Sequence, residues 1–404
     1  MTKHPIRIIG CLDPSGYGAA TRGIVQAMAA VGYGPEIVRF VPAITTSTAI
    51  GRHDELEDGW LEPYFTGDRS VEDKINIVHL NPALAGIYHT AVGGRYNIAY
   101  CAWETDRLPK KEHLYHGEHR TVVECLNLFD EVWVPSTFLV DVFKNSGVTA
   151  PIFVIPHALQ ESLLKLPPGK PAALKGDVRT TFYTIGSWNP RKNTAAVARA
   201  YWSCGWNPLT KTQLVLHQIP ANRTEEAIFA HQDTARQELI ALKEGHPDGK
   251  DAQLNIHCTP KPYSWVLRLH QSGHVLVSGS RGEGFGCGIP ALEALALGSY
   301  VVGGGGPALE DLAAVVPGSV TVLPYQQAPV EPMAEGFELD QMWWDVRQQD
   351  LSEEMKLLHS FVQEEGMPDP QDVEKVRDTY SPSTIGKLIQ KRLEHAYDVL
   401  ESRD

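Results

Sequence analysis

Residues 278–306, SGSRGEGFGCGIPALEALALGSYVVGGGG, contain the alternation on which the fold depends. The stretch begins as the end of an apolar run, HVLVSGS, and passes through a loop that carries Glu283 and four glycines. An apolar-periodic segment at 289–297 follows, and then a β-branched run at 300–302. This order predicts a strand, a glycine-rich loop, a helix and a second strand.

The glycine-rich loop has the composition of a ligand site. Glycines let a ligand approach the backbone closely, and the free N–H groups at a helix start favour an anion such as phosphate. The carboxylates of Glu283 and Glu293 flank this turn and would repel a phosphate, so we assign them to hydroxyl groups of a sugar ring or a ribose. The loop therefore predicts a site for a sugar joined to a phosphate.

Length and composition indicate a two-domain globular protein. The 404 residues suit two domains of roughly 150 to 200 residues each. A net charge of −13 argues against a surface that follows a nucleic-acid backbone. Six cysteines without a C-x-x-C pair suit a reducing compartment. Since no apolar run suits a signal peptide or a membrane span, we expect a cytoplasmic protein without a strong membrane anchor.

Strand and helix patterns alternate along the whole chain, which predicts an α/β protein with two parallel sheets. Strands are expected at 6–11, 36–40, 75–80, 96–102, 129–136 and 150–157, and then at 180–187, 213–218, 253–258, 274–280, 300–302 and 320–326. The pattern from residue 342 onward, which includes Trp343 and Trp344, is interpreted as helical. The expected domains are 1–158 and 179–375, with a linker at 159–178 and a terminal helical segment at 376–404.

Three further motifs carry charge or glycine at the ends of expected strands. Gly16 and Gly18 follow the first strand, where doubly wound folds bind phosphate, although a simple tight turn is the alternative. WETDRLP follows the strand at 96–102, so Trp103, Glu104 and Asp106 could hold an acceptor. Alternatively, the two acids cap a following helix and bind Arg107.

Arg191 and Lys192 stand at the expected start of a helix in the segment WNPRKN. Two cations at a helix N-terminus are electrostatically unfavourable unless an anion compensates them. The pair therefore predicts a diphosphate site, and a solvated basic pair is the alternative.

EGFG, IPALEALALG and YVVG together resemble the signature of the retaining nucleotide-sugar glycosyltransferases of family 4. That family has the GT-B architecture, two facing Rossmann-like domains with parallel sheets and a cleft between them, and a terminal helix that returns to the first domain. Its two signature glutamates are usually separated by seven residues, whereas nine intervene between Glu283 and Glu293. Cys287 and Gly288 resemble a two-residue insertion.

The resemblance implies roles for the motif residues. Donor-binding roles fall to Gly16, Gly18, Gly284, Phe285, Gly286 and Glu293. Catalytic roles fall to Arg191, Lys192, Glu283 and Glu104, and acceptor-binding roles to Trp103 and Asp106. No metal ligand is implied, because no D-x-D pair stands in a suitable loop.

The expected function is the transfer of a hexose, with retention, from a nucleoside-diphosphate sugar to an acceptor hydroxyl. The donor is a co-substrate, with UDP favoured by its frequency in the family, and no cofactor is expected. Possible acceptors are a glycan, a lipid, a small molecule or a modified nucleic acid. Alternatives are an epimerase or hydrolase of the same architecture, a non-catalytic sugar-nucleotide binding protein, and an NAD-dependent oxidoreductase. Against the last, DPSGYGAATRG lacks a third glycine at the required offset.

Overall fold

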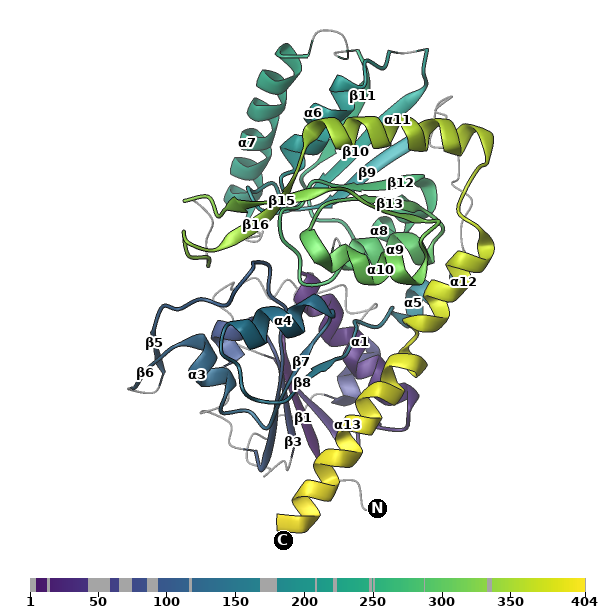
Figure 1. Ribbon diagram of the computed structural model, residues 1–404. Coiled ribbons are helices and arrows are strands. Elements are labelled where there is room, and N and C mark those ends of the chain that lie inside the picture. The colour runs from purple at the N-terminus through teal and green to yellow at the C-terminus, as the bar shows by residue number, and fades with distance from the viewer. Residues whose placement is uncertain are drawn as a thin grey trace. The chain divides into compact units, whose positions relative to one another are not determined.

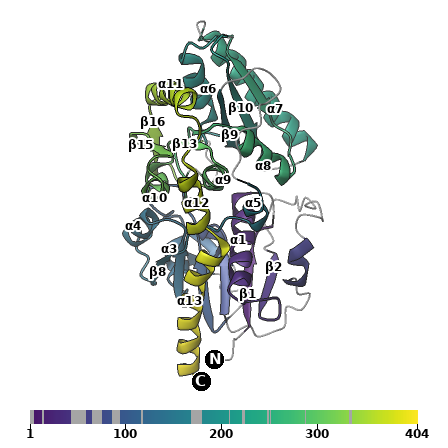
Figure 2. The ribbon, with the colours of Figure 1, turned by 90° about the vertical axis from the view of Figure 1, so that its right-hand side faces the viewer.

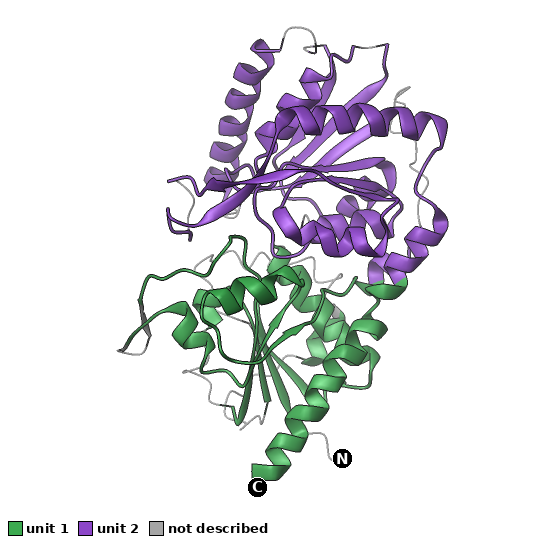
Figure 3. Cartoon of the chain, in the orientation of Figure 1, with its two compact units in different colours: residues 1–161, 378–404 green, residues 162–377 purple. Residues whose placement is uncertain are grey.

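The computed structural model divides the chain into two compact units, residues 1–161 with 378–404 and residues 162–377 (Figure 3). Unit 1 thus takes in the C-terminal segment. The structure describes residues 5–12, 15–42, 59–64, 75–85, 94–115, 118–167, 180–207, 209–220, 224–246, 249, 251–286, 288–332 and 336–403. Among the described helices, none is long and apolar enough to cross a membrane.

Unit 1 is built on a six-stranded sheet in the order β2-β1-β3-β4-β7-β8. Every neighbouring pair in it is parallel. Its strands are β1 (Ile6–Gly10), β2 (Val38–Pro42), β3 (Ile75–His79), β4 (Tyr96–Tyr100), β7 (Glu131–Val134) and β8 (Ile152–Val154). Strands β1, β3, β4 and β7 are buried along their whole length, which explains their continuous apolar runs.

Helix α13 (Pro382–Arg403) packs on α1 (Gly16–Ala30), so the C-terminus of the chain completes unit 1. The helices approach so closely at Gly386 that an added Cβ would clash with the Ala27 carbonyl oxygen. Arg392 of α13 binds the buried Glu131 carboxylate, with Nε 2.9 Å from Oε2. The remaining unit 1 elements are η1 (Gly59–Tyr64), β5 (His113–Tyr115), β6 (Glu118–Arg120), α3 (Val122–Leu126) and α4 (Phe138–Asn145).

Unit 2 is built on a second parallel six-stranded sheet, in the order β11-β10-β9-β12-β13-β14. Its strands are β9 (Thr180–Gly186), β10 (Thr212–Gln218), β11 (Gln253–His257), β12 (Val275–Ser278), β13 (Tyr300–Gly303) and β14 (Val320–Val322). Counted along the unit, this order is 3-2-1-4-5-6, the arrangement of doubly wound nucleotide-binding folds. The strand order reverses between β9 and β12.

Helices cover both faces of the unit 2 sheet (Figures 1 and 2). One face carries α6 (Thr194–Ser203), α7 (Glu225–Glu244) and α11 (Gln348–Glu364), and the other carries α8 (Tyr263–Ser272), α9 (Ile289–Ala296) and α10 (Glu310–Val315). The short elements α5 (Glu161–Leu164) and α12 (Pro370–Thr379) span the boundaries between the units, and η2 (Gly306–Leu309) precedes α10. Phe182 stacks on Trp206 at 5.1 Å between ring centroids within the core under α6 and α11.

One expected helix is a strand. Trp343 and Trp344 lie in β16 (Met342–Val346), which pairs antiparallel with β15 (Tyr325–Pro329) as a separate hairpin. The helical interpretation was wrong because helical periodicity begins only at Gln348, in α11. In MWWDV both indoles are buried, and the β-rich composition favours a strand.

Candidate active site

The candidate site lies at the switch point of the unit 2 sheet. The loops that follow β9 and β12 start on either side of the reversal in strand order. Ligands of doubly wound folds bind outside the carboxyl ends of the strands at such a point. The first loop delivers Arg191 and Lys192, and the second delivers Glu283.

Arg191, Lys192 and Glu283 form a compact charged triad. The Lys192 Nζ lies 2.5 Å from Glu283 Oε1, and Arg191 Nη1 lies 3.4 Å from Oε2. Arg191 Nη1 also donates to the Gly282 carbonyl at 2.6 Å. Both cations precede α6, which begins at Thr194 after Asn193 in the left-handed conformation (φ 45°). We expected the two cations at the start of the helix, whereas they lie in the turn before it. The anion that compensates their charge is Glu283.

The triad keeps one net positive charge at a partly open surface. The Arg191 and Lys192 side chains are 20% and 21% exposed, and that of Glu283 is 6% exposed. Burial raises the pKa of Glu283, but the Lys192 ammonium and the Arg191 guanidinium outweigh burial, so the pKa lies below its ordinary value. Glu283 is therefore ionised at neutral pH, and two cations with one anion can still attract a phosphate.

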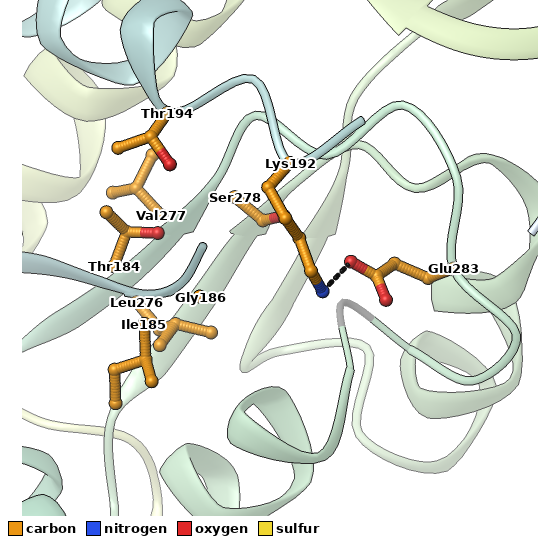
Figure 4. Close-up of a pocket in the computed structure, with 9 residues that line it drawn as sticks. All are labelled: Thr184, Ile185, Gly186, Lys192, Thr194, Leu276, Val277, Ser278 and Glu283. Atoms are coloured by element: carbon orange, nitrogen blue, oxygen red, sulfur yellow. Dashed lines mark hydrogen bonds and ion pairs between the residues drawn. The ribbon is translucent and has the colours of Figure 1, made fainter. Parts of the chain in front are cut away.

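A pocket opens beside the triad (Figure 4). It is lined by Thr184, Ile185, Gly186, Lys192, Thr194, Leu276, Val277, Ser278 and Glu283. Figure 4 shows the Lys192 ammonium directed at the Glu283 carboxylate. Three hydroxyl groups, from Thr184, Thr194 and Ser278, enter the lining. The ends of two adjacent strands thus supply backbone and hydroxyl groups, and the loops supply charge.

In the glycine-rich loop after β12, glycines serve the backbone conformation more than they supply unbound N–H groups. Gly286 and Gly288 have φ values of 56° and 88°, which favour glycine. Contrary to our expectation of free loop N–H groups, Gly286 N donates to the Ala308 carbonyl (3.0 Å) and Gly288 N to the Phe285 carbonyl (2.8 Å). Phe285 is buried. Cys287, half of the suggested insertion, lies outside the described residues.

Glu293, expected to bind a ribose, is buried on α9 and held by α8. Its Oε1 accepts from the Tyr263 hydroxyl at 2.6 Å, and its Oε2 lies 3.3 Å from His270 Nε2. His270 Nε2 and Glu293 Oε2 are close, but they are not aligned as a hydrogen bond. Nδ1 of His270 meets the Tyr183 hydroxyl at 3.0 Å, and that hydroxyl donates to Ser299. Glu293 is thus oriented by side chains behind it.

The residues predicted in unit 1 gather around α1 and the segment after β4. Gly16 is the first residue of α1, and a Cβ added there would meet nothing within 4 Å. The Gly18 N–H donates to the N-cap Ser15 at 3.3 Å. Tyr17 binds the Ala102 carbonyl at 3.0 Å, which brings the start of α1 to the predicted acceptor segment.

Trp103 belongs to the interior of that segment. Its indole is 1% exposed and donates to Thr105 Oγ1 (2.6 Å) and to the Arg107 carbonyl (2.8 Å). The indole N–H could donate to an acceptor only if these bonds break, and the predicted acceptor-binding role of Trp103 stays a prediction. Glu104 and Asp106 are half-buried, and residues 101–112 contain no helix for them to cap. Their catalytic and acceptor roles stay predictions.

His79 and His157 form a buried polar cluster in unit 1. Thr21 Oγ1 donates to the Tyr17 carbonyl, so it accepts from His79 Nδ1 at 2.8 Å. Tyr100 likewise donates to the Ile155 carbonyl and accepts from His157 Nδ1 at 3.0 Å. Burial lowers both histidine pKa values, that of His157 to about 3. Both rings are therefore neutral.

Several site residues escaped the sequence analysis. The hydroxyl residues Thr184, Thr194 and Ser278 line the pocket, and Gly303–Gly306 passes against the Glu283 loop, with an added Cβ on Gly305 only 3.2 Å from Glu283 Cγ. For Gly303–Gly306, the run of four glycines was the signal available in the sequence. Thr184 and Ser278 lie in strands and Thr194 begins α6, and hydroxyl residues at such positions carry no comparable signal.

No protein-family profile matches the sequence, and no curated protein sequence matches it significantly. Solved structures do match in fold. A glycosyltransferase from Rickettsia africae ESF-5 has a TM-score of 0.62 at 10% identity, covering 98% of this chain and 99% of that chain. An α,α-trehalose 6-phosphate synthase from Burkholderia multivorans has a TM-score of 0.59 at 10% identity, covering 99% and 100%.

A trehalose-6-phosphate synthase studied with bisubstrate glycomimetics, as a case of glycosyl transfer with retention, has a TM-score of 0.62 at 10% identity, covering 96% of this chain and 99% of that chain. These neighbours are glycosyltransferases with two Rossmann-like domains. The predicted GT-B fold, with a parallel sheet in each domain, is confirmed. At such identities the likeness extends to the fold alone.

Proposed function

We propose that this protein is a retaining glycosyltransferase that moves a hexose from a nucleoside-diphosphate sugar to an acceptor hydroxyl. The observation that carries the proposal is the triad of Arg191, Lys192 and Glu283 at the switch point of unit 2. The likeness to glycosyltransferases, one of them described as acting with retention, supports the reaction class. UDP is the favoured nucleotide.

The triad suits the departure of a diphosphate. Cleavage of the bond between the anomeric carbon and the phosphate oxygen leaves new negative charge on that oxygen, and fixed cations stabilise this charge as it develops. Arg191 and Lys192 supply the cations from a rigid turn. Because this charge compensation comes from side chains, we propose a reaction that needs no divalent metal.

The two glutamates take different parts of the donor. Glu283 uses one lone pair of each oxygen on the cations, which leaves other lone pairs for sugar hydroxyls. Glu293, already oriented by the hydrogen bond from Tyr263, accepts hydrogen bonds from the ribose. The acceptor hydroxyl is assigned to Glu104 and Asp106, with a glycan, lipid, small molecule or modified nucleic acid as the acceptor.

A thermal-shift screen against UDP-, GDP- and ADP-sugars tests donor binding. A ligand at about 100 times its Kd stabilises the folded state by about 2.7 kcal/mol, which raises the melting temperature measurably. Arg191→Ala and Lys192→Ala should remove the shift for the preferred donor, whereas Arg347→Gln, in an exposed ion pair with Asp350, should keep it. Equal shifts in all four proteins would remove the diphosphate assignment.

Transfer is then separated from related reactions by NMR. The preferred donor is incubated with and without an acceptor library, in buffer containing EDTA. A new α- or β-glycoside with the donor's anomeric configuration supports retaining, metal-independent transfer. Sugar release or epimerised donor without acceptor would instead favour the hydrolase or epimerase alternatives.

A further inference from the structure

Arg281 joins three segments that are far apart in the sequence. Its N–H donates to the Arg191 carbonyl at 2.7 Å, and its own carbonyl accepts from Trp344 N–H at 2.7 Å. One residue of the loop after β12 thus binds both the turn that carries the candidate cations and strand β16 of the hairpin.

The Arg281 side chain repeats this connection. Its guanidinium binds Asp345 of β16, with Nε 3.2 Å from Oδ1, and it also binds Glu331, which follows β15. Nη1 lies 3.5 Å from the Pro190 carbonyl. Since the guanidinium is planar and presents donors in fixed directions, these partners define its orientation. The side chain is 18% exposed, so water competes only partly for these bonds.

The hairpin also packs against the glycines that lie behind Glu283. An added Cβ on Gly306 would come 2.5 Å from Trp344 Cδ2, and one on Gly304 would come 2.9 Å from Val346 Cγ1. Gly305, between them, lies against Glu283. The glycine segment is therefore held between the hairpin on one side and the Glu283 loop on the other.

We propose that the β15–β16 hairpin holds the donor site in its binding geometry and that Arg281 is the positioning residue through which the hairpin acts. Through Arg281 the hairpin fixes the Arg191 carbonyl, and with it the directions in which the Arg191 and Lys192 side chains leave their turn. This inference rests on the proposed function, because the ligand that benefits is the donor diphosphate. Arg281 acts through the turn and makes no contact with the ligand.

The test uses the full-length chain with Arg281→Gln, Arg281→Lys and the double variant Asp345→Asn/Glu331→Gln. The double variant removes both ion pairs of Arg281 from the hairpin side, in case Arg281→Gln does not fold. Arg347→Gln is the matched control, since it removes an arginine that directly follows β16 and whose guanidinium binds Asp350 of α11, outside the hairpin and the candidate site. Two quantities are measured: the Kd for UDP by calorimetry, and hydrogen exchange of peptides covering 187–193 and 279–286.

Arg281→Gln and the double variant should raise the Kd at least tenfold and speed exchange in both peptides. Arg281→Lys should recover part of both effects, and Arg347→Gln should change neither. If the exchange rate of the 187–193 peptide stays unchanged in these variants, the inference is overturned, whatever the Kd. A raised Kd without faster exchange would mean that Arg281 contacts the ligand directly. Faster exchange with an unchanged Kd would also overturn the inference. If the parent protein binds no nucleoside diphosphate, the proposed function fails, and the exchange rates alone decide whether the hairpin sets the turn.

Discussion

Removal of the Lys192 ammonium should expose how strongly Glu283 depends on it. Lys192→Met keeps the aliphatic stem and leaves the carboxylate, 6% exposed, with Arg191 as its remaining cation at 3.4 Å. Loss of a partner from a fully buried ion pair costs about 3–5 kcal/mol, and loss of one hydrogen bond to a charged group about 1.5–3 kcal/mol. Because Lys192 is partly exposed and Arg191 remains, we expect about 2 kcal/mol of destabilisation.

The assay is urea unfolding of the parent protein, Lys192→Met, Glu283→Gln and the double variant at pH 7.5. The double variant should be more stable than the sum of the single effects predicts, by about 1–2 kcal/mol, as neighbouring paired residues couple. The pKa of Glu283 is held below 4.5 in the folded parent, so the pair's contribution is present above pH 4.5 and is lost as the pH falls through the folded pKa. Additive effects at pH 7.5 would refute the claim that the two charges compensate each other.

Three further predictions concern other parts of the molecule. Gly386→Ala should destabilise unit 1 by about 2–3 kcal/mol in urea unfolding, because the new methyl group overpacks the α1 contact, whereas Gly16→Ala, with open space around it, should stay within about 0.5 kcal/mol of the parent. His157 has a pKa of about 3 when folded against an ordinary 6.5, so between pH 6.5 and about 3 the unfolded chain alone binds that proton. Stability should fall by about 1.4 kcal/mol per pH unit from this group, and His157→Gln should remove that part of the slope. Tyr263→Phe removes a 2.6 Å hydrogen bond to Glu293 and should weaken UDP binding several-fold by calorimetry, and an unchanged Kd would argue against a ribose role for Glu293.

The strands could be predicted from the sequence because their signal is local. Runs such as IRIIG and INIVH are apolar throughout, and the structure buries each of them on both faces of a parallel sheet. The same alternation predicted a second parallel sheet, but it is compatible with several strand orders, so the 3-2-1-4-5-6 order of unit 2 comes from the structure alone. The Trp343 and Trp344 hairpin was missed because a short, isolated antiparallel pair lacks such a pattern.

The chemistry of the site was only partly predictable, since its contacts are long-range. Sequence patterns indicated Arg191, Lys192 and Glu283 separately, but the bond between Lys192 and Glu283 joins residues 91 positions apart. The predicted compensating anion was a ligand, and the structure places a carboxylate of the chain there instead. Trp103 was assigned to an acceptor from its place after a strand, and only the fold shows that its indole points into the protein.

The central claim is that the switch point of unit 2 binds a nucleoside diphosphate, and a crystal structure of the protein with UDP tests it most directly. The account predicts diphosphate oxygens within 4 Å, the salt-bridge distance, of both Arg191 and Lys192, with the ribose hydroxyls on Glu293. Nucleotide bound at another place would contradict the account. The account would also be contradicted if crystals soaked at saturating UDP showed no nucleotide beside the Lys192–Glu283 pair and this pair kept its bond.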